Sequence, residues 1–222
     1  MVDTIEQTES RIDPMQLKPN RSVLYRVVKR AFDIGSSICG LLLLSPVFLI
    51  TAAAIRTEDG GPAFFVQQRN GENGKPFSMF KFRSMCVSAP KLRAGMEELN
   101  ELDGPAFKLK NDPRVTKVGK FIRRTSIDEL PQLLNILRGD MSVVGPRPLP
   151  TYETEKLTLE QRQRLLVKPG LLCYWQISGR NNIGFSEWME MDYRYIRSAG
   201  ILTDLKIILA AIPAVLSGNG AE

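Results

Sequence analysis

The feature that most constrains this chain is a segment without charge. No Asp, Glu, Lys or Arg occurs from Ile34 to Ile55, and runs of four apolar residues occupy positions 41–44 and 47–50. At 1.5 Å per residue, an α-helix over this segment would be about 33 Å long, close to the hydrocarbon thickness of a bilayer. A helix that is apolar all round needs lipid or a large core around it, and a chain of 222 residues builds one modest core. The sequence therefore predicts a membrane segment.

Three arrangements of this segment compete. A signal peptide is suggested by Ala52-Ala53-Ala54, which resembles a small-residue cleavage site, although the basic arm before it is long. A plain spanning helix would place Arg56 and the residues after it across the bilayer from Lys29 and Arg30. That arrangement conflicts with the tendency of positive charge to stay on the cytoplasmic side, because basic residues lie both before and after the segment.

The third arrangement is a re-entrant helix broken at Ser45-Pro46. Proline removes a backbone N–H and bends a helix, and a serine hydroxyl can satisfy the carbonyl that loses its partner. A helix broken there enters and leaves on one face, which keeps both basic flanks on the same side. We favour this arrangement, with membrane lipid as a partner.

The rest of the chain predicts a mainly helical α+β fold. Residues 1–20 are a loose polar arm, and 21–56 hold a basic amphipathic stretch followed by the re-entrant helix. The region 57–222 forms one domain. In it, strands at 63–66 and 77–82 flank a turn-rich segment and a helix covers 89–102. An apolar helix at 201–216 lies at the membrane interface or docks on the core. This predicts a short β-hairpin among helices.

Composition narrows the chemistry. The sequence has no histidine, so acid–base or metal chemistry falls to carboxylates, Lys, Tyr or Cys. Its three cysteines form no C-x-x-C pair, which argues against a disulfide framework and a thiolate metal site. The net charge of +6 suits anionic lipid, nucleotide phosphate or nucleic acid without choosing among them.

The acidic pair Asp128-Glu129 is the first candidate site. Ser126 and Glu129 fit a capping box, with a helix beginning just before Pro131. Both carboxylates can therefore be explained as partners of the helix dipole, without any function. As a functional pair they can hold a divalent cation against a pyrophosphate, or one of them can attack phosphorus.

Arginines beside this pair favour the functional interpretation. Arg123 and Arg124 precede it, and Gly145-Pro146-Arg147-Pro148 follows the predicted helix. Arginine binds phosphate oxygens in bidentate pairs. Pro146 and Pro148 restrict the backbone around Arg147, which lowers the entropy lost when its guanidinium binds a ligand.

Several sequence blocks resemble one family, the bacterial sugar transferases, also called monotopic phosphoglycosyl transferases. The blocks occur in the family's order and cover most of the chain from Lys29 to Leu216. They are Lys29-Arg30-Ala31-Phe32-Asp33, Lys81-Phe82-Arg83-Ser84-Met85, Asn111-Asp112-Pro113-Arg114-Val115-Thr116, Thr125-Ser126-Ile127-Asp128-Glu129-Leu130-Pro131-Gln132-Leu133, Val144-Gly145-Pro146-Arg147-Pro148, Lys168-Pro169-Gly170 and Trp175-Gln176-Ile177-Ser178-Gly179-Arg180.

The resemblance implies a Mg²⁺-dependent enzyme of the bacterial inner membrane, with its catalytic domain on the cytoplasmic face. Such enzymes transfer a sugar phosphate from a UDP-sugar to polyprenyl phosphate, usually undecaprenyl phosphate, and release UMP. This is the first membrane step of exopolysaccharide or glycoconjugate assembly. The resemblance also implies the minimal form, because longer members carry additional spanning helices and a further domain.

The resemblance assigns roles residue by residue. An aspartate matching Asp128 is the covalent nucleophile, and Glu129 supports the metal or deprotonates the acceptor. Arg147 binds nucleotide or phosphate within Pro146–Pro148. Arg123, Lys81 and Arg83 are weaker phosphate-binding candidates, each with solvated surface charge as the alternative. The Ser45-Pro46 break matches the family's re-entrant helix.

Two other classes of protein remain as alternatives. A non-catalytic membrane adaptor would keep the hairpin and lose the acidic pair or the Pro-Arg-Pro loop, and both are present. A nucleic-acid-binding protein is suggested by the basic balance alone, and the chain lacks a recognition-helix pattern. We therefore expect no nucleic-acid partner. The sequence leaves open the sugar, the acceptor length and whether the chain forms a homo-oligomer.

Overall fold

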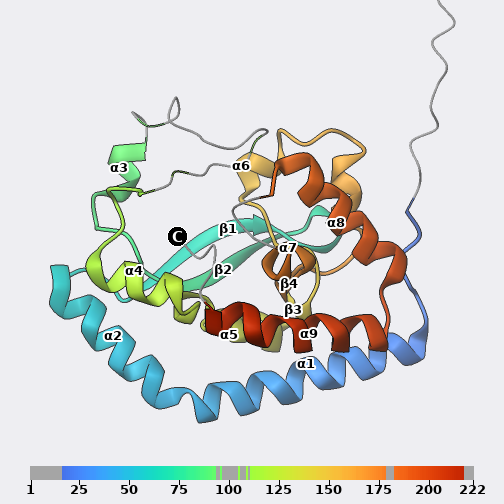
Figure 1. Cartoon of the computed structure of the whole chain (residues 1–222), viewed down its shortest axis with the longest axis horizontal. Helices are drawn as coiled ribbons and strands as arrows, with labels where there is room; N and C mark the ends of the chain where they lie inside the picture. The colour runs from blue at the N-terminus through green and yellow to red at the C-terminus, as the bar shows by residue number, and fades with distance from the viewer. Residues whose placement is uncertain are drawn as a thin grey trace, which may run out of the picture.

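The computed structural model describes residues 17–93, 96, 105, 109, 111–178 and 183–217. Its longest helices lie along one side of the molecule, with a β-hairpin and shorter helices above them (Figure 1). In chain order the elements are α1 (Val23–Leu43), α2 (Ser45–Asp59), β1 (Phe64–Asn70), η1 (Glu72–Gly74), β2 (Pro76–Phe82), α3 (Ala89–Arg93), α4 (Lys117–Arg124), η3 (Ile127–Glu129), α5 (Gln132–Arg138), β3 (Ser142–Val144), α6 (Thr151–Thr154), η4 (Gln161–Leu166), β4 (Gly170–Leu172), α7 (Tyr174–Ile177), α8 (Phe185–Ser198) and α9 (Ile201–Ser217).

The uncharged segment forms two helices joined at a bend. α1 and α2 meet at an angle of 61°; within the described residues neither spans a bilayer by length and apolarity, whereas the bent pair together meets both requirements. Pro46 cannot donate to the carbonyl of Leu42, four residues earlier. The Ser45 hydroxyl donates to that carbonyl instead, at 2.8 Å. The predicted compensation of the proline break by serine is confirmed.

Three charged residues attach α1 to the rest of the domain. Arg30 donates to the carbonyls of Ile136 and Leu137 at the end of α5, at 2.6 and 2.7 Å. The carboxylate of Asp33 accepts hydrogen bonds from Ser142 and Val143 of β3. Lys29 pairs with Asp204 of α9 at 2.7 Å and donates to the carbonyl of Val144. The Lys29–Asp33 block is therefore the joint between the apolar helices and the domain.

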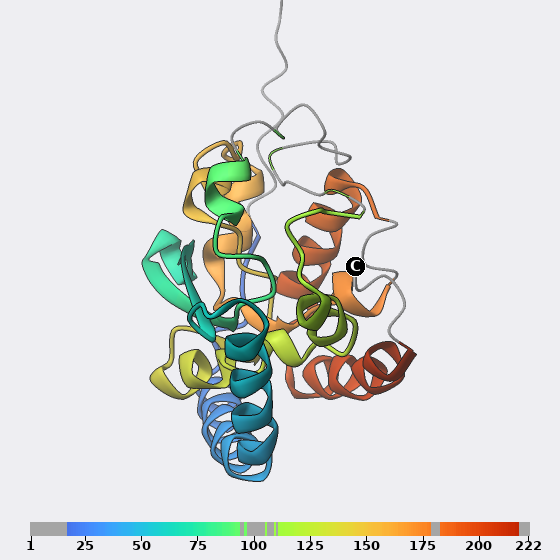
Figure 2. The ribbon, with the colours of Figure 1, turned by 90° about the vertical axis from the view of Figure 1, so that its left-hand side faces the viewer.

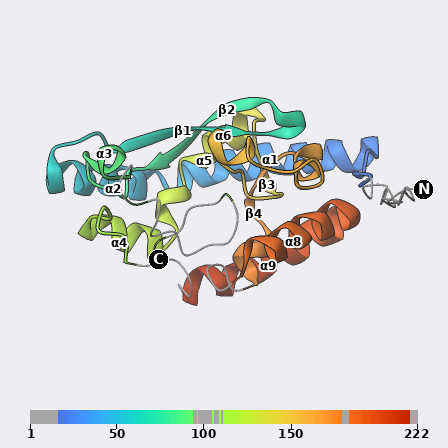
Figure 3. The same cartoon turned by 90° about the horizontal axis from the view of Figure 1, so that it is seen from above.

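Two small sheets frame the domain, so the α+β class is confirmed. β1 and β2 form the predicted antiparallel hairpin, in a register that opposes Phe65 to Lys81 and Arg69 to Phe77. A second, parallel pair joins β3 to β4, and the sequence did not predict it. The hairpin lies on one side of α1 and the α8–α9 pair on the other (Figures 2 and 3).

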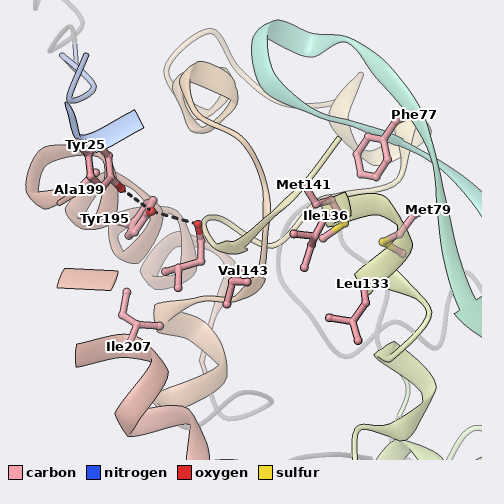
Figure 4. Packing of buried hydrophobic residues seen from close by; sticks show 11 residues of the cluster. Tyr25, Phe77, Met79, Leu133, Ile136, Met141, Val143, Tyr195, Ala199 and Ile207 are labelled. Carbon is pink, nitrogen blue, oxygen red and sulfur yellow. Dashed lines mark hydrogen bonds between the residues drawn. The ribbon is translucent and has the colours of Figure 1, made fainter. Parts of the chain in front are cut away.

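The main core lies where α1, β2, α5, β3, α8 and α9 meet. It contains Ile136, Met141 and Ile207, which have no exposed surface. The core also contains buried hydroxyl groups. The Tyr195 hydroxyl lies between the Tyr25 hydroxyl and the carbonyl of Val144 (Figure 4). Asp204 accepts from both tyrosines, so these buried polar groups are hydrogen-bonded.

The structure corrects one local prediction. Ser126 has a left-handed backbone conformation, with φ 57°, and its side chain makes no capping hydrogen bond. The acidic pair forms the 3₁₀ turn η3 instead, and α5 begins three residues later with Pro131 at its N-cap. The capping box is therefore wrong, because the carboxylate it required has other partners, described below.

The other predicted helices have mixed outcomes. The apolar C-terminal helix is confirmed as α9, with Pro213 inside it. The helix predicted over 89–102 appears as α3, which covers 89–93, and most of its remaining residues lie outside the described part of the chain. The same holds for residues 1–16 of the predicted arm and for Gly179-Arg180.

Two glycines bring the backbones of neighbouring loops together. A β-carbon on Gly145 would lie 2.3 Å from the carbonyl oxygen of Lys168, and one on Gly170 would lie 2.0 Å from the amide nitrogen of Gly145. These contacts place the Pro146–Pro148 loop directly against the Lys168–Gly170 segment.

We expect Gly145→Ala to lower the free energy of unfolding by about 3 kcal/mol, because the clash is with backbone atoms that cannot rotate away. Gly35→Ala is the control, since an added β-carbon there would have no neighbour within 4 Å in a helix that favours alanine. Denaturant unfolding in detergent measures both. Equal stability of the two variants would show that the loops separate easily.

Candidate active site

The acidic pair lies at the centre of a group of charged side chains. Asp128 and Glu129 are each 8% exposed and belong to the short 3₁₀ turn η3. A pair that only complemented a helix dipole would not need to be buried. Burial of two adjacent carboxylates requires compensation by cations or hydrogen bonds.

Glu129 receives that compensation directly. One oxygen of its carboxylate accepts from Arg147 at 2.6 Å and from Lys81 at 2.9 Å. The other accepts from the side-chain amide of Gln176 at 3.2 Å. Burial opposes ionisation of Glu129, but Arg147 and Lys81 together outweigh it and hold its pKa well below the usual range. Glu129 is therefore a fixed negative charge that positions three side chains.

Asp128 is placed differently. Lys81 lies 3.8 Å from its carboxylate, and among the described residues no hydrogen bond to that carboxylate is present. Burial raises the pKa of Asp128; Lys81 opposes this shift and the negative charge of Glu129 adds to it. The two neighbouring carboxylates thus differ in character, and the oxygens of Asp128 are available to a ligand.

Further cations surround the pair. Arg123 acts electrostatically on Asp128 and donates to the Ser84 hydroxyl at 2.9 Å, and burial lowers its pKa. Burial, and then the nearby Arg147, lower the pKa of Arg69 to about 10. Four cations, Lys81 included, therefore surround two carboxylates. The excess of positive charge fits an anionic ligand with several phosphate oxygens.

Arg147 is held from its backbone and its side chain. Pro146 and Pro148 flank it in the loop after β3, and the carbonyl of Arg147 accepts from Arg164 at 2.6 Å. Its guanidinium lies 5.3 Å from the centre of the Trp175 ring, a cation–π contact. A quarter of its side chain is exposed, so part of the guanidinium remains accessible to a ligand.

Arg83 is not brought to the acidic pair. Its guanidinium binds both carboxylate oxygens of Asp59 at 2.5 Å and donates to the carbonyls of Pro62 and Met85. These contacts tie the end of α2 to the end of β2. The role of Arg83 in phosphate binding stays a prediction, and its described contacts favour a structural one.

Two residues of the site carried no predicted role. Arg69 shares a face of the hairpin with Lys81, because the register pairs Phe65 with Lys81 and side chains alternate along β1. The alternation of side chains along a strand could therefore have predicted that Arg69 lies on the same face as Lys81. Gln176 belonged to a recognised block, but its contact with Glu129 spans 47 positions and left no local signal.

The residues fit a divalent cation of the magnesium type only with help from a ligand. The described residues contain no group of three or more Asp, Glu or Cys side chains that could hold a metal ion. Asp128 can supply carboxylate oxygens, whereas both oxygens of Glu129 already accept hydrogen bonds. Mg²⁺ commonly takes one or two carboxylates and completes its six ligands with water and substrate phosphate. An ion here would therefore bind together with the phosphorylated substrate.

Activity should be lost as the pH falls, because Asp128 becomes protonated. This loss should occur at a higher pH than for an ordinary aspartate, whose pKa is about 3.9, because burial raises the pKa of Asp128. Protonation would remove the free carboxylate. Glu129→Gln should move this limb of the kcat/KM profile to lower pH, since the charge of Glu129 raises the pKa of Asp128. Lys81→Met should move it to higher pH. Shifts in the same direction for both variants would refute the assignment.

Comparison with known proteins identifies the family of this chain. The family model described as bacterial sugar transferase matches residues 24–218. The chain is 49% identical over 197 residues to galactosyl transferase CpsE of Streptococcus agalactiae serotype III, which covers 88% of this chain and 44% of that protein. It is 42% identical over 203 residues to undecaprenyl-phosphate galactose phosphotransferase of Salmonella typhimurium, covering 88% of this chain and 42% of that protein.

A third relative matches along most of both chains. Exopolysaccharide production protein ExoY of Rhizobium meliloti is 41% identical over 202 residues, covering 88% of each. The chain spans less than half the length of the streptococcal and Salmonella relatives. The acidic pair, the Pro-Arg-Pro loop and the bent helix all lie within the matched region. The chain belongs to the bacterial sugar transferase family.

Proposed function

We propose that this chain transfers a sugar phosphate from a UDP-sugar to undecaprenyl phosphate or a similar polyprenyl phosphate, and releases UMP. Relatives whose names include undecaprenyl-phosphate galactose and glucose phosphotransferases support the type of reaction. The observation that carries the proposal is the division of the acidic pair. Glu129 is saturated by three side chains, whereas the buried carboxylate of Asp128 accepts no hydrogen bond from the described residues.

The first half of the reaction is attack by Asp128. Its carboxylate oxygen forms a bond to the sugar-linked phosphorus of the donor, and the bond from that phosphorus to the oxygen of UMP breaks. Lys81 and Arg147 are placed to bind the phosphate oxygens and stabilise the charge that develops on them. UMP leaves with the electron pair, and the phosphosugar stays on Asp128.

The second half regenerates the enzyme. A phosphate oxygen of the polyprenyl acceptor attacks the same phosphorus, the bond to Asp128 breaks, and a polyprenyl diphosphate sugar leaves. The Glu129 carboxylate is ionised and already accepts three hydrogen bonds, so it acts by holding Lys81, Arg147 and Gln176 in position. Bound Mg²⁺, held by Asp128 with support from Glu129, would neutralise phosphate charge.

The proposal is tested by the half-reaction. Enzyme, Mg²⁺ and UDP-sugar, without lipid, should exchange labelled UMP into the UDP-sugar and release at most one UMP per active site. A screen of UDP-sugars, with undecaprenyl phosphate added, first identifies the donor by UMP release. A preparation that is active with lipid and shows no exchange with that donor would overturn the covalent route.

We further propose that α1 and α2 form a re-entrant hairpin in the bacterial inner membrane, with the domain on the cytoplasmic face. Leu42, Leu43, Leu49 and Ile50, near the bend, are each at least 70% exposed. Apolar side chains exposed on two consecutive helices are stabilised by lipid. Basic residues flank both ends of the hairpin, which favours one side for both.

Cysteine labelling tests this topology. In a background without the three native cysteines, Lys18→Cys and Glu72→Cys place exposed thiols before and after the hairpin. Both should resist a membrane-impermeant maleimide in intact cells and react after the inner membrane is permeabilised. Labelling of one position alone in intact cells would show that the segment spans. Pro46→Ala should favour that spanning form.

A further inference from the structure

A cavity of about 190 Å³ adjoins the acidic pair, and the proposed reaction as described above does not use it. Residues of η3, β4, α7 and α9 line it, and it is open on one side. Its polar lining residues are Glu129, Gln176, Thr125 and Ser126, and the rest of the wall is apolar. That apolar wall includes Ile127, Leu130, Leu171, Ile177, Ala211 and Ala214. The cavity thus joins a polar end at the site to an apolar interior.

We infer that this cavity binds the isoprene unit next to the phosphate of the acceptor lipid; this inference rests on the proposed function. The chemistry of the walls selects the occupant, because they offer hydrocarbon contact and few polar partners. Size agrees, since an apolar cavity of about 150 Å³ accepts the six carbons of benzene and an isoprene unit has five.

The position of the cavity gives the orientation of the lipid. The acceptor phosphate must reach the phosphorus held on Asp128, and one C–O bond joins that phosphate to the first isoprene carbon. Glu129 lies in the wall of the cavity and next to Asp128 in the chain, so an acceptor bound there has its phosphate at the acidic pair. The donor phosphates lie on the side of the cations.

α9 supplies the exit for the rest of the lipid. Its Ala211 faces the cavity and is 4% exposed, whereas Leu205, Leu209 and Ile212 on the same helix are about half exposed. α9 also contacts α1, the first helix of the proposed membrane hairpin. The small side chains of Ala211 and Ala214 leave the space that an isoprene unit needs beside an apolar helix.

The test uses substitutions on α9 in the full chain. Ala211→Leu places a larger side chain in the cavity, and Ala214→Leu does so at a less buried position. Ala210→Leu is the matched control, because it makes the same change one residue away at an exposed position. Each variant is assayed in nanodiscs for lipid-free UMP exchange and for the KM of undecaprenyl phosphate.

We expect Ala211→Leu and Ala214→Leu to keep UMP exchange and to raise the KM for undecaprenyl phosphate at least about tenfold. Loss of contact for two buried methylene groups already corresponds to that factor. Ala210→Leu should match the unsubstituted enzyme in both assays. An unchanged KM in two variants that exchange UMP normally would overturn the cavity assignment and leave the proposed function standing. Absence of UMP release by the unsubstituted enzyme with UDP-sugars, Mg²⁺ and undecaprenyl phosphate all present would overturn the function itself.

Discussion

Asp128→Asn should lower the rate of UMP exchange and of overall transfer by at least about a thousandfold, because an amide cannot replace a covalent nucleophile. The fold should survive. Burial already disfavours the ionised form of Asp128, so a neutral amide of the same shape leaves thermal stability at neutral pH unchanged or raised. Melting temperature and exchange rate, measured on one preparation, separate these effects.

Asp140→Asn is the control for this substitution, since it makes the same chemical change in the turn after α5. It should keep at least most of the exchange activity. A mass increase of one phosphosugar on the peptide that contains Asp128, in enzyme incubated with donor alone, would locate the intermediate. Near-normal turnover by Asp128→Asn would return the acidic pair to a structural role.

Arg147→Met should have two large effects that a second substitution can separate. It leaves Glu129 buried with Lys81 and Gln176 alone, which should lower the free energy of unfolding by about 3 kcal/mol. It also removes a guanidinium from the phosphate oxygens, which should lower kcat/KM at least about a hundredfold. Denaturant unfolding and steady-state kinetics measure the two quantities.

The double variant Arg147→Met with Glu129→Gln separates the loss of stability from the loss of activity. Removing the unpaired carboxylate should restore much of the lost stability, because a buried amide costs less than a buried charge. Activity should not recover. Arg124→Met serves as the control, since that arginine is exposed. Recovery of activity together with stability would mean that Arg147 only supports the fold.

The sequence predicted those parts of this protein that depend on local patterns. The uncharged segment, the hairpin and α9 follow from hydropathy and turn residues, and Lys81, Arg123 and Arg147 do come together at the acidic pair. Patterns of charge alone could not separate Lys81 from Arg83. Two residues apart, one compensates Glu129 and the other binds Asp59 of α2, because β2 ends between them.

Contacts between distant segments escaped prediction. The parallel pairing of β3 with β4 joins positions 28 residues apart, and each strand has three residues, too few to show a period. The capping box failed for a related reason. Ser126 and Glu129 have the right spacing for a capping box. However, the charge-assisted hydrogen bonds from Lys81 and Arg147 stabilise the Glu129 carboxylate more than a hydrogen bond from a backbone amide would.

The attachment of α1 has a consequence for where the chemistry takes place. The helix is continuous from Val23 to Leu43, and its hydrogen bonds to α5, β3 and α9 come from residues between Tyr25 and Asp33. No loop separates that rigid joint from the bend at Leu44, which is about 16 Å further along the helix. In the proposed hairpin, this length fixes the height of Asp128 above the lipid headgroups. In that hairpin, a thinner bilayer or a tilted helix would move the acidic pair relative to the acceptor phosphate, so we expect the transfer rate to depend on membrane thickness.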